Sequence, residues 1–344
     1  MFNSLRSRIA LALVKKQLPK IMAGDPLSDL PDGLHVAIVG SGSPLPDPKR
    51  GNPCAAVLAG DRLFIVDAGE GSSETMNRMR LDPGRIEAML LTHFHSDHIG
   101  GISSVNLQRW IAEDTATSMR VLGPPGVDRV INGLNEAYAL DGGYRTAHHG
   151  EAIAPSANYP MTVEPFAIPA GEESLVLIDD GGLKVTAFTV DHTPIEPAVG
   201  FRFDYAGRSL VISGDTVYSP NLVRASRGAD LLVHDALGRE LLKMVEDAAG
   251  EAGLKARQQI MADVWDYHAT PQDAADSATE AGVGALALTH IVPPLPLKGL
   301  EGPFLGDTRE RFDGPLWLAE DGDLYSLARG GTGVERNNLI GRRG

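Results

Sequence analysis

The stretch LTHFHSDHIGG, residues 91–101, places four metal-competent side chains within six positions of a chain that has only 10 histidines. A buried-strand run, AMLLT, ends just before the first of them, and an apolar helical run follows the glycine pair. His93 and His95 stand two apart and can point the same way, whereas Asp97 and His98 can face a second point. Imidazole and carboxylate groups suit zinc, iron or manganese. The stretch therefore predicts two half-built metal positions at the edge of a sheet.

Three further candidate ligands follow other strand-like runs. His192 ends KVTAFTVDH, Asp215 follows LVISG, and His290 ends ALALTH. A lone histidine after a strand is more often a satisfied core or surface residue. Here residues that can bind metal follow four separate strand-like runs, and one of the four positions is a dense cluster. Ordinary core or surface residues do not explain this recurrence, which favours a shared metal centre.

The rest of the chain alternates apolar runs with turn signals. The runs that predict strands are 35–40, 55–60, 62–69, 88–93, 119–123, 229–236 and 284–290. Helices are predicted over 99–113, 127–140, 238–265 and from Pro271, which Thr270 caps. Hairpins are predicted around 179–182 and 205–207 and over 316–328, and 141–161 reads as an irregular segment. Two halves, each with strands first and helix–strand alternation later, predict an α/β fold with two sheets face to face and helices outside.

Taken together, five marks resemble the metallo-β-lactamase fold superfamily. They are VDAGEG with Asp67, the HxHxDH loop, the isolated His192, SGDT with Asp215 and LTH with His290, in the family's order. The resemblance implies a four-layer αββα sandwich with two divalent metal ions at one edge. Zinc is the expected metal, with manganese or iron as alternatives.

The resemblance also implies a role for each residue of the site. One metal would be held by His93, His95 and His192. The other would be held by Asp97, His98 and His290. Asp215 would bridge the two, and Asp67 would orient a ligand or a loop. The catalytic groups would be Asp97 and His268, the latter near the leaving group. His268 could also be an ordinary surface residue before a helix.

The branch with the closest resemblance contains the transfer-RNA 3′-processing ribonuclease Z and small arylsulfatase-like hydrolases. Ribonuclease Z of the usual kind carries a long arm between the positions of His192 and Asp215, which here are joined by a segment just long enough for one hairpin. The chain also has IVPPLP after LTH and inserts about thirty residues, 238–267, before His268. Its formal net charge is 31 − 45 = −14, which argues against a large nucleic-acid partner.

These departures predict a dinuclear-metal hydrolase of small anionic esters. The substrate would be a phosphodiester, a phosphonate ester or a sulfate ester, attacked by a metal-bound hydroxide. Two alternatives stay open: a transfer-RNA 3′-processing endoribonuclease, and a lactonase or β-lactamase-like carbonyl hydrolase. In the segment 141–161, the candidate substrate-binding residues are Tyr144, Arg145, His148 and His149. They could equally be ordinary loop residues.

The two ends of the chain are predicted to lie outside the hydrolase domain. Residues 1–33 predict an amphipathic helix and a leader, 34–330 the hydrolase domain, and 331–344 a mobile tail. The helix would pack on the body or on a partner subunit of a homo-oligomer, or lie on a membrane surface. A transmembrane segment is not expected, because no apolar run is long enough. The single cysteine, Cys54, allows no internal disulfide, which favours a cytoplasmic location without excluding export.

Overall fold

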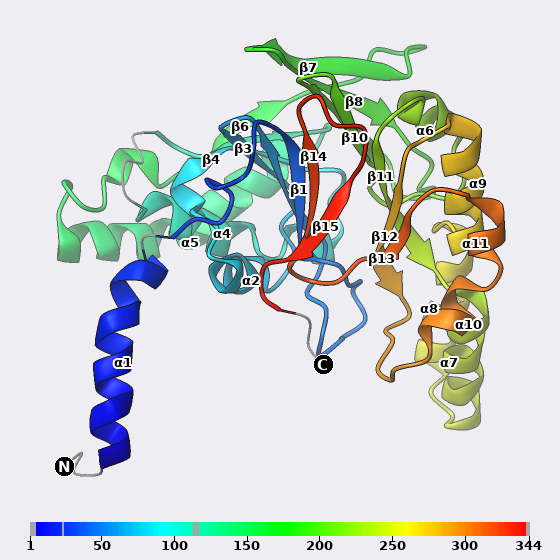
Figure 1. Ribbon diagram of the computed structural model, residues 1–344, viewed down its shortest axis with the longest axis horizontal. Helices are drawn as coiled ribbons and strands as arrows, with labels where there is room; N and C mark the ends of the chain where they lie inside the picture. Colours follow the sequence, from blue (N-terminus) through cyan, green and yellow to red (C-terminus); the bar gives the residue numbers. More distant parts are fainter. Residues whose placement is uncertain (1–4, 23, 113–116, 342–344) are drawn as a thin grey trace.

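The computed structural model describes residues 5–22, 24–112 and 117–341. Within these ranges the strands form two mixed sheets that pack face to face (Figure 1). The first sheet has the strand order β15-β14-β1-β2-β3-β4-β5-β6. Its strands are β1 (Gly33–Gly40), β2 (Cys54–Ala59), β3 (Arg62–Val66), β4 (Ile86–Leu90), β5 (Arg120–Gly123), β6 (Thr162–Pro165), β14 (Asp323–Ala328) and β15 (Glu335–Asn338).

The second sheet has the order β13-β12-β11-β10-β9-β8-β7. Its strands are β7 (Ser174–Asp180), β8 (Leu183–Thr189), β9 (Val199–Tyr205), β10 (Arg208–Ile212), β11 (Leu231–Leu237), β12 (Leu286–Val292) and β13 (Leu316–Leu318). The strands β10 to β13 run parallel, whereas β7 to β10 are joined as antiparallel neighbours, as the two predicted hairpin turns require.

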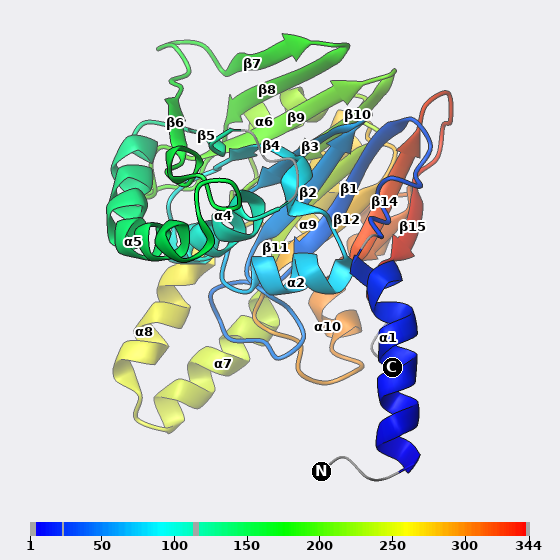
Figure 2. The ribbon, with the colours of Figure 1, turned by 90° about the vertical axis from the view of Figure 1, so that its left-hand side faces the viewer.

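Helices cover the outer face of each sheet (Figure 1). On the first sheet they are α2 (Ser72–Met79), α3 (Ser96–Ile99), α4 (Ile102–Trp110) and α5 (Val127–His149). On the second they are α6 (Pro220–Ser226), α9 (Pro271–Ala281) and α11 (Thr308–Arg311). Helices α7 (Arg239–Glu251) and α8 (Lys255–Asp263) project beyond the strands, with α10 (Glu301–Leu305) beside α7 (Figure 2). Three short 3₁₀ turns complete the elements: η1 (Pro83–Arg85), η2 (Ser156–Asn158) and η3 (Val264–Asp266). The predicted four-layer αββα sandwich is confirmed.

Strand β1 shows why the sequence folds in this way. Its residues are buried throughout, because alternate side chains face different layers. Val36 and Ile38 belong to the core between the sheets, whereas Ala37 and Val39 pack in the core under the outer helices. A strand covered on both faces therefore carries a continuous apolar run.

Residues 316–328 do not form the expected hairpin. β13 pairs in parallel with β12 in the second sheet, and β14 pairs antiparallel with β1 in the first. The turn between them crosses from one sheet to the other. Asp321–Gly322 does form a turn, but β13 and β14 do not pair with each other; their partners are β12 and β1.

The segment 141–161 is irregular only in its later part. Helix α5 continues through His149, nine residues beyond the predicted end near residue 140. Gly142 lies in this extension and lets the helix approach Tyr159, whose ring carbon would lie 2.3 Å from a Cβ at this position.

The predicted N-terminal helix is present, and the C-terminal tail differs from expectation. Helix α1 (Leu5–Met22) projects away from the sheets in both views, and Leu11, Val14 and Leu18 are about half exposed, so it does not pack on the body (Figures 1 and 2). The expected mobile tail contributes β15, which pairs with β14; residues 342–344 lie outside the described ranges. Among the described residues, no helix combines the length and apolarity needed to cross a bilayer.

The core between the sheets depends on large rings. Phe203 of the second sheet is fully buried, and its ring centroid lies 6.1 Å from that of Phe64 in the first. We predict that Phe203→Ala lowers the free energy of unfolding by about 3–5 kcal/mol, because the lost ring leaves a cavity. Val176→Ala on β7, where the side chain is 44% exposed, should change it by less than about 0.5 kcal/mol. Urea unfolding measures both, and equal midpoints for the two variants would contradict this account of the core.

Candidate metal centre

The predicted ligands converge where the two sheets meet. His93 and His95 follow β4 of the first sheet, and helix α3 carries Asp97 and His98. The remaining ligands come from the second sheet: His192 after β8, Asp215 after β10 and His290 within β12. The structure thus brings together residues from four separate segments, three that follow a strand and one, His290, inside β12, two residues before its end.

The carboxylate of Asp215 lies at the centre of the cluster. Its Oδ2 is 3.2 Å from Nε2 of both His98 and His290. The Nε2 atoms of His93 and His192 lie 3.7 Å and 3.9 Å from the same oxygen. One buried carboxylate oxygen therefore faces four imidazole nitrogens from both halves of the fold.

The candidate ligand atoms form three groups, each with its atoms within 4.8 Å of one another. The first is His93, His95, His192 and Asp215, the second is Asp97, His98 and His290, and the third, which includes His268, is described below. Asp97 Oδ2 lies 3.3 Å from His290 Nε2 and 3.6 Å from His98 Nε2. The first two groups match the two sets that the resemblance implied. Asp215 also lies 3.2 Å from His98 and His290 of the second group, which suits the bridging position.

Four imidazoles are held through Nδ1, which leaves Nε2 for the centre. Nδ1 of His93 lies 3.1 Å from the Thr92 hydroxyl, and that of His98 lies 2.8 Å from Asp67 Oδ2. Nδ1 of His192 donates to the carbonyl of Tyr267 at 2.8 Å. Such contacts fix the ring orientation and the tautomer of a metal-ligating histidine. The fourth imidazole, that of His268, follows the same pattern and is described below.

The residues present fit a pair of metal ions. In the described part of the chain, the buried Nε2 atoms of His98 and His192 have no hydrogen-bond partner. Buried polar atoms without partners are rare in native proteins, and each calls for an explanation. Divalent cations would satisfy these atoms, and imidazole and carboxylate are ligands that such cations accept. The cluster therefore has the chemistry of a dinuclear metal site.

Protonation in the cluster follows burial and charge. Burial lowers the pKa of His93 well below its usual value and that of His192 to about 4, so both rings are neutral, the form that binds metal. Burial also acts on His98, but the carboxylates of Asp215 and Asp67 outweigh it and raise the His98 pKa. Burial alone would raise the pKa of Asp215, yet His290 and His98 hold it well below the ordinary range. Bound cations would replace these protons as the counter-charge.

Asp67 has the orienting position expected of it. Its carboxylate accepts hydrogen bonds from the Thr92 backbone N–H at 2.8 Å and the Thr92 hydroxyl at 2.7 Å, as well as from His98. Asp67 and the ligand His290 both have left-handed backbones, with φ of 55° and 49°. Such strain in residues other than glycine persists only where the surroundings enforce it, and it is frequent at functional sites.

Two glycines allow the metal-binding loop to approach its neighbours. A Cβ at Gly69 would lie 2.1 Å from the carbonyl oxygen of Asp97, and one at Gly101 would lie 2.0 Å from the carbonyl oxygen of Gly69. Neither position has room for a side chain. Gly69 of VDAGEG and Gly101 of HIGG are thus needed for the close backbone packing around the centre.

His268 lies beside the centre and not at the surface. It is buried, and it forms a group with Asp215 and His290 whose ligand atoms lie within 4.8 Å. Its Nδ1 lies 2.9 Å from Oδ2 of Asp235, at 1% exposure near the end of β11. Sequence reasoning missed Asp235 as a site residue, although the His234–Asp235 pair near the end of a buried strand gave the signal that identified Asp215.

The four candidate substrate-binding residues lie on α5. Tyr144 is 68% exposed, Arg145 pairs with Asp141 at 2.8 Å, and the rings of His148 and His149 contact each other. Within the described ranges, no hydrogen bond or ion pair joins these four side chains to the metal ligands. Their role in substrate binding stays a prediction. These side chains lie on a helix, whereas the sequence suggested a loop.

Comparison with known proteins places the chain in a family. Residues 62–291 match the model of the beta-lactamase superfamily domain. A ribonuclease Z of Mycobacterium marinum is 33% identical over 290 residues, which are 84% of this chain and 96% of that protein. The chain belongs to the beta-lactamase superfamily. With its His/Asp clusters, it is a metal-dependent hydrolase of this superfamily.

Solved structures support the fold. The metallo-beta-lactamase fold protein YhfI from Bacillus subtilis has a TM-score of 0.60 at 17% identity and covers 85% of this chain and 99% of its own. Human tRNase Z, short form, has a TM-score of 0.59 at 23% identity and covers 85% and 98%. At these identities the likeness extends to the fold alone.

The expected small anionic ester substrate is overturned by these relatives. The ribonuclease Z of M. marinum aligns over nearly its whole length, so the absence of a long arm does not separate this chain from proteins of that name. The argument from net charge against a large nucleic-acid partner is overturned as well. Net charge is a sum over the whole chain and does not report the charge around one site. The arylsulfatase-like resemblance is likewise unsupported.

The central position of Asp215 predicts a loss of metal in one variant. Asp215→Asn keeps the shape of the side chain but removes the charge shared by both ligand groups. We expect the metal content of the purified protein to fall from two ions per chain to one or fewer, measured by mass spectrometry of the elements. Asp179→Asn, at an exposed position on β7, should keep two. Retention of two ions by Asp215→Asn would show that this carboxylate is not a shared ligand.

Proposed function

We propose that this chain is an endoribonuclease of the ribonuclease Z type, which cuts precursor transfer RNA at the 3′ side. The observation that carries the proposal is the 33% identity to a protein named ribonuclease Z, extending over 84% of this chain and 96% of that protein. The complete set of predicted ligand residues at one centre supports a hydrolytic reaction. The bond cleaved would be a phosphodiester.

The proposed metal ligands divide as the geometry groups them. His93, His95 and His192 would hold one ion, Asp97, His98 and His290 the other, and Asp215 both. Two divalent ions bound there would activate a water and neutralise charge on the phosphate oxygens. The metals are proposed to be zinc, with manganese or iron as alternatives. The carboxylate of Asp97, in addition to its ligand role, would accept a proton from the attacking water.

His268 is the proposed proton donor to the leaving group. Its Nδ1 is held by the buried carboxylate of Asp235, so Nε2 is the nitrogen left to face the centre. Departure of the ribose 3′-oxygen builds negative charge on that oxygen, and a proton from Nε2 would relieve it. Asp235 would stabilise the protonated ring and hold its orientation, so it is a positioning residue.

The substrate assignment is tested by comparing substrates on one preparation. With zinc or manganese supplied, we expect a precursor transfer RNA with a 3′ extension to be cut once, with kcat/KM at least about a hundredfold above that of an aryl phosphodiester. A chelator should abolish cleavage and added metal should restore it. Equal or faster turnover of the aryl phosphodiester, or of a lactone, would refute the ribonuclease assignment.

The role of His268 predicts a loss in the chemical step. His268→Ala should lower kcat for the precursor by about 10²–10⁴-fold, the usual contribution of a positioned general acid, while two metal ions per chain remain bound. Lys184→Ala, at an exposed position on β8, is the control and should leave kcat unchanged. If His268→Ala retains full kcat, or loses activity only because metal is lost, the proton-donor role is wrong.

A further inference from the structure

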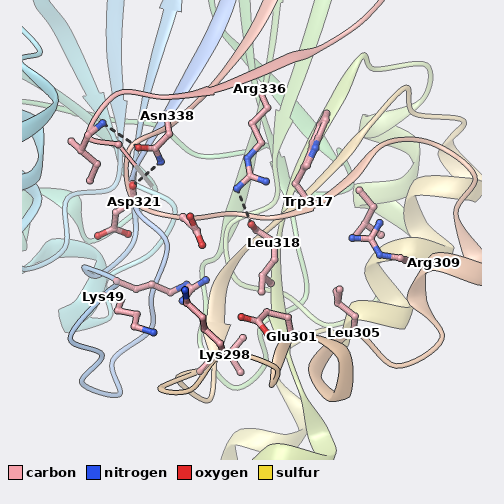
Figure 3. Close-up of a pocket in the computed structure, with 16 residues that line it drawn as sticks. Lys49, Lys298, Glu301, Leu305, Arg309, Trp317, Leu318, Asp321, Arg336 and Asn338 are labelled. Atoms are coloured by element: carbon pink, nitrogen blue, oxygen red, sulfur yellow. Dashed lines mark hydrogen bonds between the residues drawn. The ribbon is translucent and has the colours of Figure 1, made fainter. Parts of the chain in front are cut away.

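A cavity separate from the metal centre lies beside the loop that follows β1; we call it the second cavity. It has a volume of about 340 Å³. Its wall is built from that loop, the segment after β12, helices α10 and α11, and strands β13 and β15 (Figure 3). None of the proposed metal ligands lines it. Its size lies within the range of small-molecule sites.

One wall of this cavity is apolar. Leu295, Leu305, Leu316 and Leu318 contribute to it together with the half-buried indole of Trp317. The Trp317 ring packs against Tyr325, with centroids 5.2 Å apart, so its position is fixed. The leucine side chains face the core under the outer helices, whereas the indole faces the core between the sheets. The edge of β13 therefore offers apolar surface from both of its faces to a flat ring.

Positive charge surrounds the cavity, although the whole chain carries a formal −14. Lys49, Lys298 and Arg309 line it and are exposed, and in the described part of the chain none of them forms an ion pair. Arg50 also lines it; its side chain is only 8% exposed, and its buried Nε has no hydrogen-bond partner. Arginine and lysine donors are suited to phosphate oxygens.

Three carboxylates also line the cavity, those of Glu301, Glu320 and Asp321. Asp321 is buried and accepts hydrogen bonds from the Ser41 and Gly51 backbone N–H groups at 3.0 Å and 2.8 Å. Glu301 accepts the Gly299 N–H at 2.7 Å. Glu320 is exposed and forms no ion pair among the described residues, so it can accept from an amino group of a ligand. An anionic group and a ring with N–H donors would therefore both find partners here.

We propose that this cavity is a second ligand site, which binds a nucleoside phosphate. The base lies against the apolar surface at the edge of β13, and the phosphate binds Lys298, with Lys49 and Arg309 on either side of it (Figure 3). The ligand can be a free nucleotide or one nucleotide of an RNA chain. The second source has a geometric basis, because the Ile291 N–H, directly after the proposed ligand His290, donates to the Ser41 carbonyl at 3.0 Å. The loops of the cavity and of the metal centre are thus joined.

The indole of Trp317 provides a local reporter. The chain has three tryptophans. Trp110 is buried, and Trp265, three positions before His268 in the sequence, can be changed to Phe so that its fluorescence does not contribute. In this Trp265→Phe background of the metal-loaded protein, we expect adenosine monophosphate to change the fluorescence with saturation. Adenosine and inorganic phosphate should each bind at least about tenfold more weakly, since each offers half of the contacts.

Charge removal assigns the effect to the cavity. Lys298→Ala combined with Arg309→Ala should weaken adenosine monophosphate binding about tenfold or more. The matched control is Lys184→Ala with Arg227→Ala, which removes two exposed cations outside the lining of this cavity. Neither cation forms an ion pair within the described ranges, and this variant should change the affinity for adenosine monophosphate by less than twofold. The inference is overturned if the nucleotide gives no saturable change, if inorganic phosphate binds as tightly, or if both double variants behave alike.

A 5′-phosphorylated RNA pentanucleotide separates the two sources. Binding tighter than that of adenosine monophosphate, with the same loss in Lys298→Ala/Arg309→Ala, identifies RNA as the ligand source. Weaker binding than that of the mononucleotide identifies a free nucleotide. Because the fluorescence does not depend on cleavage, failure of this site and failure of the proposed ribonuclease activity are separate results.

Discussion

The burial of one carboxylate, that of Asp215, is the constraint on which the site depends. This side chain is almost fully removed from water, and four imidazoles from both halves of the fold surround it. A buried carboxylate is tolerated only with compensating positive charge. Without metal, Asp215 raises the pKa of both His98 and His290 against the effect of burial, so protons supply that charge. With two cations bound, the cations supply it, and this couples metal binding to proton release.

The sandwich gives this centre its rigidity. The ligands follow strands that are fixed by their neighbours on both sides, and the imidazoles are oriented by groups outside the ligand set, such as Thr92 and Asp67. The left-handed backbones of Asp67 and His290, and the two glycines without room for a Cβ, occur at the same place. A set of local conformations that would be costly in a free peptide is thus held by the surrounding sheets.

Local charge and total charge carry different information in this chain. The formal net charge of −14 predicted a small substrate, and the relatives named ribonuclease Z contradict that prediction. Lys49, Lys298 and Arg309 line the second cavity even though the chain as a whole is acidic. Association with a polyanion depends on the field near the site, which a sum over 344 residues averages away.

The sequence by itself determined the layers of the fold and the members of the metal centre. Both can be predicted from local sequence patterns. Apolar runs indicate the buried strands, and metal-ligating residue types such as His93 and Asp215 follow those runs. The tertiary structure alone decided what depends on distant partners. The runs of β13 and β14 are equally suited to either sheet, and only their neighbours place them in different ones. Gly142 approaches Tyr159 only in the folded chain, and Asp235 acquires its role only from His268, 33 residues away. Backbone and side-chain propensities act over a few residues, whereas these contacts form only when the chain has folded.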